Sequence, residues 1–259
     1  IYNFVDSDTK NIVTNEEIKF KEEYEKLNGV YNEKTDNYYV NVNILENNNV
    51  KYKNADEIID ILKNGTGVIY FGFPECPWCR NLVPILVNTL NEYTMPFYYY
   101  NASNIRDSKH LDENGNVVTD KEGTKEYYEI ISILKDYLGE YSGLNDSSIK
   151  RLYFPTLVFV KEGKIVYVHI GTLDSQENPY IELTEDQKTE LSNAALRILS
   201  TESAFIISLA LQWLKALFSI TLIPVKSMVV FSSWQNALSK NLTSLCSDTR
   251  YFPFLYLLL

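Results

Sequence analysis

The chain has 259 residues, of which 45% are hydrophobic and 14% aromatic, a content that is sufficient for a folded core and argues against disorder. The formal net charge of −10 argues against a nucleic-acid partner, because surfaces that bind nucleic acid are basic. The charge is uneven, since residues 196–259 carry five basic and two acidic side chains and the remainder is strongly acidic. We therefore expect these two parts to belong to different environments.

The first third of the chain predicts two helices and a strand. Residues 1–14 are polar and are expected to form a tether, and residues 16–27 predict a charged amphipathic helix that ends at Asn28-Gly29. Alternating polar and apolar residues over 37–44 predict a strand with one buried face. A short helix is predicted over 55–63, closed by Asn64-Gly65.

The sequence that follows predicts a buried strand, a tight turn and a helix. Residues 68–73 are apolar throughout, which is typical of a strand inside a sheet that is covered on both faces. The turn contains Cys76-Pro77-Trp78-Cys79, and residues up to Glu92 have apolar side chains at helical spacing. Pro77 suits the first helical turn, because its φ fits and its missing N–H would be unpaired there.

This turn places two cysteines where a reversible dithiol–disulfide couple is expected. Cys76 lies at the predicted helix N-terminus, where free N–H groups and the helix dipole favour a thiolate, and Cys79 follows about one turn later. Half of a zinc site is the alternative, and it would need two further ligands. The remaining candidates, His110, His169 and Cys246, are scattered, so we favour the redox interpretation and expect no metal and no cofactor.

The middle of the chain predicts a strand, a polar loop and a helix. A strand is predicted over 95–101, and the polar residues 102–123 are expected to form a loop. Asp112, Asn114 and Asn116 resemble the start of a calcium loop, but the glycine and the closing glutamate of that motif are missing, so a turn is favoured. Residues 124–138 predict a helix.

The segment from Tyr153 to Gly171 predicts a compact hairpin, because two apolar runs flank a Glu-Gly turn. Pro155 at the start of the first run needs a special position, since proline cannot donate to a strand ladder. A further helix is predicted to start at Thr184 and to run through Leu191 and Leu196.

Two separated motifs resemble the thioredoxin superfamily. The strand and dithiol turn over 68–80 resemble that superfamily's active-site segment, and Phe154-Pro155-Thr156 with the following hairpin resembles its cis-proline segment. Within the superfamily, the sequence around the cysteines looks most like bacteriocin-transport accessory proteins and related thioredoxin-like proteins of Gram-positive bacteria. The resemblance implies an α/β thioredoxin-like fold over 35–195, with a central mixed sheet flanked by helices, an N-terminal extension over 1–34 and a polar, helical insertion.

The resemblance also implies roles for individual residues. Cys76 would be the attacking thiol and Cys79 the buried, resolving thiol, while Pro155 would be cis and lie against the disulfide. Phe154 would offer main-chain hydrogen bonds to a substrate peptide, and Trp78 would present an apolar surface to it.

One position departs from the superfamily's pattern. Thioredoxins carry a buried acid six residues before the first cysteine, and here that residue is Tyr70. Glu75 is the nearest carboxylate in sequence, so it is the candidate for handling protons, or it raises the thiol pKa by repulsion.

The C-terminal part, 196–259, has three interpretations. Residues 204–225 are mostly apolar and long enough for a bilayer span, with Lys215 near the centre. A membrane anchor, a helix that covers the domain or a partner, and a segment foreign to the family all fit. The chain begins at Ile1 without a signal sequence, so a leader was removed or the sequence starts downstream of it.

The sequence therefore predicts a thiol–disulfide oxidoreductase that acts on cysteines of proteins or peptides and depends on a separate redox partner. We expect it outside the cytoplasm, with the anchor as an option and a cytoplasmic location as the alternative. A non-catalytic accessory module for peptide export is the competing function. A peroxide- or thiol-sensing protein is the third.

Overall fold

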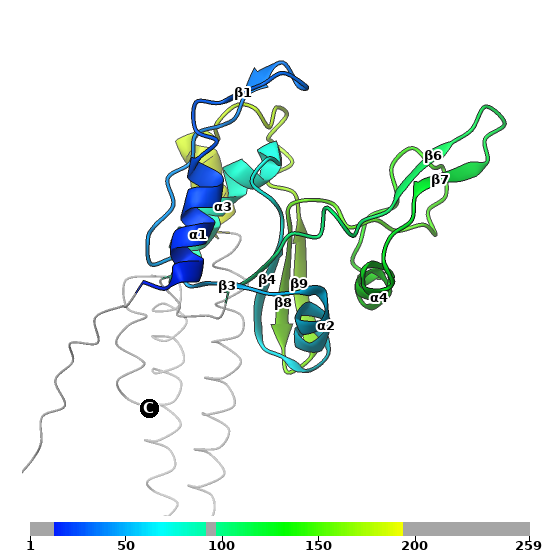
Figure 1. Ribbon diagram of the computed structural model, residues 1–259, viewed down its shortest axis with the longest axis horizontal. Helices are drawn as coiled ribbons and strands as arrows, with labels where there is room; N and C mark the ends of the chain where they lie inside the picture. Colours follow the sequence, from blue (N-terminus) through cyan, green and yellow to red (C-terminus); the bar gives the residue numbers. More distant parts are fainter. Residues whose placement is uncertain (1–12, 92–96, 194–259) are drawn as a thin grey trace, which may run out of the picture. The chain divides into compact units, whose positions relative to one another are not determined.

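The computed structural model describes residues 13–91 and 97–193, which form an α/β unit built on a mixed five-stranded sheet with helices on both faces (Figure 1). This confirms the predicted α/β class and the central mixed sheet. The strands follow the order β3 (Val50–Tyr52), β5 (Phe97–Tyr100), β4 (Gly67–Phe71), β8 (Thr156–Lys161) and β9 (Lys164–Ile170).

Strand β4 lies at the centre of the sheet. It runs parallel to β5, which is also parallel to β3, and antiparallel to β8, which pairs with β9 as the predicted hairpin. All five residues of β4 are buried, because neighbouring strands occupy both edges and helices cover both faces. The strand ends five residues before Cys76, so the dithiol turn lies just beyond the carboxyl end of this central strand.

One face of the sheet is covered by α2 (Ala55–Asn64) and α4 (Lys125–Leu134). Both helices begin at a side-chain cap, because Asn54 and Thr124 accept hydrogen bonds from main-chain N–H groups three residues later. Their apolar sides meet residues of β4 and β8 that point to the same face, namely Ile69, Phe71, Val158 and Val160.

The other face carries an aromatic core under α1 (Asn15–Glu25) and α3 (Pro77–Asn91). Phe20 of α1 packs edge-on against Phe97 and Tyr99 of β5, with ring centroids 6.2 and 5.0 Å apart. The predicted first helix is therefore an integral part of the packed unit, although residues 1–34 were expected to form an extension.

The polar segment 102–123, which was predicted to be a loop, contains a β-hairpin. Strands β6 (Ser108–Leu111) and β7 (Val117–Lys121) pair with each other outside the central sheet, beside α4 (Figure 1). The predicted turn is confirmed, since an Asp112 carboxylate oxygen accepts the N–H groups of Asn114 and Asn116 at 2.9 and 2.8 Å. The strands were missed because most of their residues are polar and no residue of either strand is buried.

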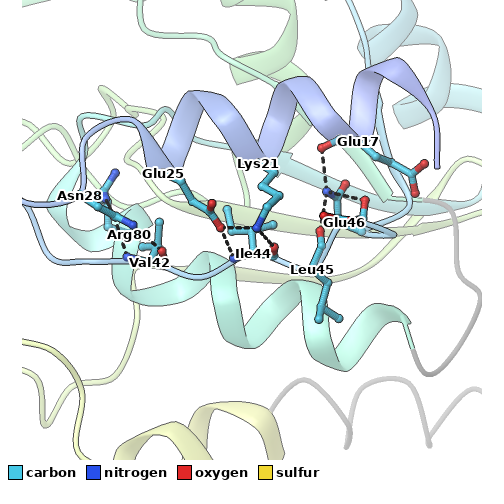
Figure 2. A network of polar contacts seen from close by, with 10 residues as sticks. Glu17, Lys21, Glu25, Asn28, Val42, Ile44, Leu45, Glu46 and Arg80 are labelled. Atoms are coloured by element: carbon cyan, nitrogen blue, oxygen red, sulfur yellow. Dashed lines mark hydrogen bonds and ion pairs between the residues drawn. The ribbon is translucent and has the colours of Figure 1, made fainter.

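The predicted strand over 37–44 is wrong for most of its length. Only β2 (Asn37–Tyr38) is a strand, paired with the short β1 (Tyr31–Asn32). Residues 40–44 still alternate between buried and exposed, but side chains of the first helix and the loop after it bind their main chain in place of a neighbouring strand (Figure 2).

The bonds to this segment come from three side chains. Asn28 binds both main-chain groups of Val42, at 2.7 and 2.9 Å, while Glu25 accepts the N–H of Ile44 and Lys21 donates to its carbonyl. Sequence periodicity reports which side chains are buried, and it does not distinguish a strand from an extended segment that is bound by side chains.

The predicted helix after Thr184 is present over residues 185–193, and the Thr184 hydroxyl caps it by accepting the N–H of Gln187. Of the tether predicted over 1–14, residues 1–12 lie outside the described residues, as does the apolar segment 204–225, while Thr14 caps α1. Within 13–91 and 97–193, no helix is both long and apolar enough to cross a membrane.

Replacing Asn28 tests how the 40–44 segment is held. Asn28→Ala removes both bonds to Val42 and a bond from Arg80, so we expect the free energy of unfolding to fall by about 1–3 kcal/mol in chemical denaturation. Asn43→Ala is the matched control, because Asn43 lies in the same segment and is exposed, and it should change stability by less than about 0.5 kcal/mol. Equal effects of the two substitutions would contradict this account.

Candidate functional site

The two cysteines lie in a turn that connects β4 to α3. The Cys76 N–H donates to the Phe73 carbonyl at 3.2 Å, and the Cys76 carbonyl accepts the N–H of Arg80 at 3.1 Å. Helix α3 begins at Pro77, the position that the sequence predicted. Cys76 therefore directly precedes the first helical residue, where the unpaired N–H groups of the helix gather.

The Cys76 sulfur is held by main-chain groups on two sides. It accepts the N–H of Cys79 at 3.3 Å, and its thiol donates to the Phe154 carbonyl at 3.7 Å. Hydrogen bonding from the Cys79 thiol, opposed by burial and assisted by the N–H groups of the first helical turn, lowers the pKa of Cys76 below the ordinary thiol value. Of the two thiols, Cys76 is therefore the one that ionises to a thiolate more readily.

Cys79 has the opposite character. Its side chain is 0% exposed, against 5% for Cys76, and both residues are free thiols. Burial raises the pKa of Cys79 well above the ordinary value, and the neighbouring Cys76 sulfur adds to this effect. The pair is therefore asymmetric, with one sulfur favoured as a thiolate and the other held as a thiol.

The predicted cis-proline segment lies against the first cysteine. The Phe154–Pro155 peptide bond is cis, and the Phe154 carbonyl is the group that Cys76 contacts. The segment is fixed by two further bonds, from the Thr156 hydroxyl to the Tyr153 carbonyl at 2.7 Å and from the Gly171 N–H to the Pro155 carbonyl at 2.8 Å. The structure thus brings together Cys76, Cys79, Phe154 and Pro155 from distant parts of the chain.

Tyr70 occupies the position where a buried acid was expected. Its side chain is fully buried, and its hydroxyl lies 2.8 Å from the hydroxyl of Tyr24. Hydrogen bonding by this hydroxyl lowers the pKa of Cys79, against the larger effect of burial, which raises it. Gly72 makes room for this arrangement, because a Cβ at that position would collide with the Tyr70 hydroxyl. Burial raises the pKa of Tyr70 well above its usual value, so this hydroxyl is a hydrogen-bond donor at neutral pH.

A buried arginine connects the dithiol helix to the N-terminal helix. Arg80 is 1% exposed and donates to the carbonyls of Val40, Tyr24 and Pro74 at 2.6, 2.8 and 3.2 Å. A fourth bond, 2.8 Å long, reaches the Asn28 side-chain oxygen. The arginine therefore ties α3 to α1 and to the segment before Asn41 through neutral acceptors.

Sequence reasoning missed the roles of Tyr24 and Arg80. Tyr24 is separated from Tyr70 by 46 positions, and the helix that carries it was assigned to an extension. Arg80 follows the second cysteine directly, and a charged residue next to the motif was a local signal that could have drawn attention to it.

Two further predicted site residues lie in the same turn. Trp78 is half-buried in the first turn of α3, between the cysteines, and Glu75 is exposed just before Cys76. Among the described residues, Glu75 makes no hydrogen bond to either sulfur, so its role in proton handling stays a prediction, as does substrate contact by Trp78.

The alternative metal ligands lie on separate elements. His110 on β6 is bonded to Asp120 at 2.9 Å, and His169 lies on β9. Across residues 13–91 and 97–193, there is no cluster of three or more histidine, cysteine or acidic side chains placed so that they could bind a metal ion. Cys246 lies outside the described residues.

Comparison with known proteins adds no family assignment. No protein-family model matches the chain, and no curated protein matches its sequence.

Hydrogen bonding by the Tyr70 hydroxyl lowers the pKa of Cys79, which burial raises, so removing this hydroxyl should raise the pKa of that thiol further. In a Cys76→Ser background, Tyr70→Phe is expected to slow alkylation of Cys79 about three- to tenfold at a fixed pH and to move the pH profile upward. Mass spectrometry of the Cys79 peptide measures this rate.

Tyr99→Phe is the matched control for this experiment. Tyr99 is also buried and its ring stacks on that of Tyr70 at 5.7 Å, but among the described residues no hydrogen bond from the Tyr99 hydroxyl lowers the pKa of Cys79. Its removal should leave the profile unchanged, and equal effects of the two variants would rule out a specific role for the Tyr70 hydroxyl.

Proposed function

We propose that the chain is a thiol–disulfide oxidoreductase of the thioredoxin superfamily, acting on cysteines of proteins or peptides. One observation carries the proposal. The Cys76 sulfur lies between the N-terminus of a helix, the second thiol and the carbonyl before a cis proline. The helix N-terminus and the second thiol favour a reactive thiolate at Cys76, and the cis-proline segment beside it offers a main-chain edge that an extended peptide could contact.

The topology supports the thioredoxin assignment. The sheet order β3-β5-β4-β8-β9, with three parallel strands followed by an antiparallel hairpin, is the order expected of that fold. The dithiol follows the central strand, and the cis proline precedes the next strand of the same sheet. The β6–β7 hairpin would then be an insertion between β5 and α4.

In the proposed reaction the Cys76 thiolate attacks one sulfur of a substrate disulfide. A Cys76–substrate bond forms while the substrate S–S bond breaks, and the second substrate sulfur leaves as a thiolate that takes a proton from water. The depressed pKa of Cys76 keeps the thiolate populated below the pH at which ordinary cysteines ionise.

Cys79 completes the reaction. It loses its proton and attacks the Cys76 sulfur, so that the Cys76–Cys79 disulfide forms and the second substrate thiol is released with that proton. The step requires a thiolate inside the core, which burial disfavours. The Tyr70 hydroxyl, which is hydrogen-bonded to the Tyr24 hydroxyl, stabilises the Cys79 thiolate by donating a hydrogen bond to it. In thioredoxins the buried acid would instead accept the proton of the resolving thiol.

Substitutions of the two cysteines should block different steps of the reaction. Cys76→Ser is expected to abolish reduction of insulin disulfides, because no attacking thiolate remains. Cys79→Ser should instead trap a mixed disulfide between Cys76 and the substrate, visible on a non-reducing gel.

Cys246→Ser is the control, since it removes a thiol outside the motif and should leave the rate unchanged. Full activity in Cys76→Ser would refute catalysis by this pair and leave a non-catalytic binding module as the better description.

A further inference from the structure

Two arginines flank the cis-proline segment. The guanidinium of Arg106, in the loop after β5, lies over the Phe154 ring with its central carbon 4.7 Å from the ring centroid. Arg151, four residues before Pro155, lies over the Tyr141 ring at 4.1 Å and near that of Tyr153 at 5.8 Å. Both side chains are half-buried.

These arginines have no acidic partner among the described residues. The adjacent carboxylate, Asp107, is buried and pairs with Lys109 at 3.5 Å instead. The side chain of Arg106 makes one long hydrogen bond, 3.4 Å to the Leu152 carbonyl, and the Nε of Arg151 is buried without a hydrogen-bond partner. Most of their N–H donors are thus not used by the described residues.

The two charges also act on each other. Burial lowers the pKa of Arg106, and the charge of Arg151 lowers it further. A half-buried cation that is repelled by a second one would be stabilised by an anion. Stacking on aromatic rings occupies the faces of the guanidinium groups, and their N–H edges remain suited to a carboxylate.

Phe154 connects this arginine pair to the reactive sulfur. Its carbonyl contacts the Cys76 sulfur at 3.7 Å, while its ring carries the Arg106 guanidinium. An anion bound by Arg106 would therefore lie beside the residue whose carbonyl contacts the Cys76 sulfur. The rest of the described unit is acidic, so this local positive charge contrasts with its surroundings.

We propose that Arg106 and Arg151 form a carboxylate-binding subsite, so that the preferred substrate has an acidic residue next to its reacting cysteine. This inference rests on the proposed thiol–disulfide exchange and names its substrate class. In the reaction, the Cys76 thiolate forms a bond to the substrate sulfur and the substrate S–S bond breaks, while the carboxylate beside that sulfur is held by the arginines. The electrons come from the enzyme's own dithiol.

The test uses the full chain, reduced beforehand, in single-turnover reactions with two synthetic peptide disulfides. The peptides differ only in whether glutamate or glutamine flanks the reacting cysteine. We expect the glutamate peptide to react about five- to tenfold faster, as one charge-assisted hydrogen bond would give. Glutathione disulfide, a small molecule with carboxylates near its sulfur, separates general carboxylate preference from recognition of a longer peptide.

Arg106→Gln and Arg151→Gln should each reduce the ratio of the two rates towards one. The ratio is the informative quantity, because Arg106 also lowers the pKa of Cys76 and its loss would slow both peptides together. Arg106→Lys should retain part of the preference, since it keeps the charge and loses the planar fork. Lys51→Gln, which removes one exposed charge on the edge strand β3, is the control and should leave the ratio unchanged.

Equal rates for both peptides in the wild-type protein would overturn the subsite while leaving the oxidoreductase proposal intact. A preference that Lys51→Gln weakens as much as the arginine variants would also overturn it, because the effect would then reflect overall charge. Failure of both peptides and of glutathione disulfide to react would refute the proposed function itself.

Discussion

The contact between the Cys76 sulfur and two main-chain groups is the feature on which the proposed chemistry depends. The sulfur accepts the N–H of Cys79 and lies against the Phe154 carbonyl, so its position depends on a helix start and on a segment 78 residues further along the chain. The pairing of β4 with β8 brings the two segments together. The strands are antiparallel, the dithiol turn follows the end of β4, and the Phe154–Pro155 bond precedes the start of β8.

Burial then separates the two thiols. Cys76 lies at the edge of the core, where N–H groups favour its thiolate, and Cys79 lies within it, where charge is unfavourable. The groups around Cys79 are aromatic and hydroxyl-bearing, with Tyr70 placed by stacking on Tyr99 and by the space above Gly72. The hydroxyls of Tyr24 and Tyr70 would stabilise a Cys79 thiolate without losing or gaining a proton at neutral pH. The proposed activity would therefore depend less on the ionisation of a second group than the activity of a site with a buried acid.

Local signals predicted the strand, the dithiol turn, the helix after it and the β8–β9 hairpin, because each depends on neighbouring residues such as Pro77 or Glu162-Gly163. The meeting of Cys76 with Phe154 was expected from a resemblance, since spacing alone does not reveal which strands become neighbours. The bond between Tyr24 and Tyr70, the four bonds of Arg80 and the side-chain-bound segment 40–44 could not be predicted. They arise from tertiary packing between elements that no local pattern relates, and the β6–β7 hairpin has no buried face to mark it.

The reduction potential of the Cys76–Cys79 pair is the most direct test of the account. It is measured by equilibrating the full chain in glutathione redox buffers and counting alkylated cysteines by mass spectrometry. We expect one two-electron transition in which both cysteines oxidise together, with a potential between about −270 mV, typical of a reductant, and about −120 mV, typical of an oxidant. A pair that stays as two thiols across this range, or whose cysteines oxidise independently, would contradict the account.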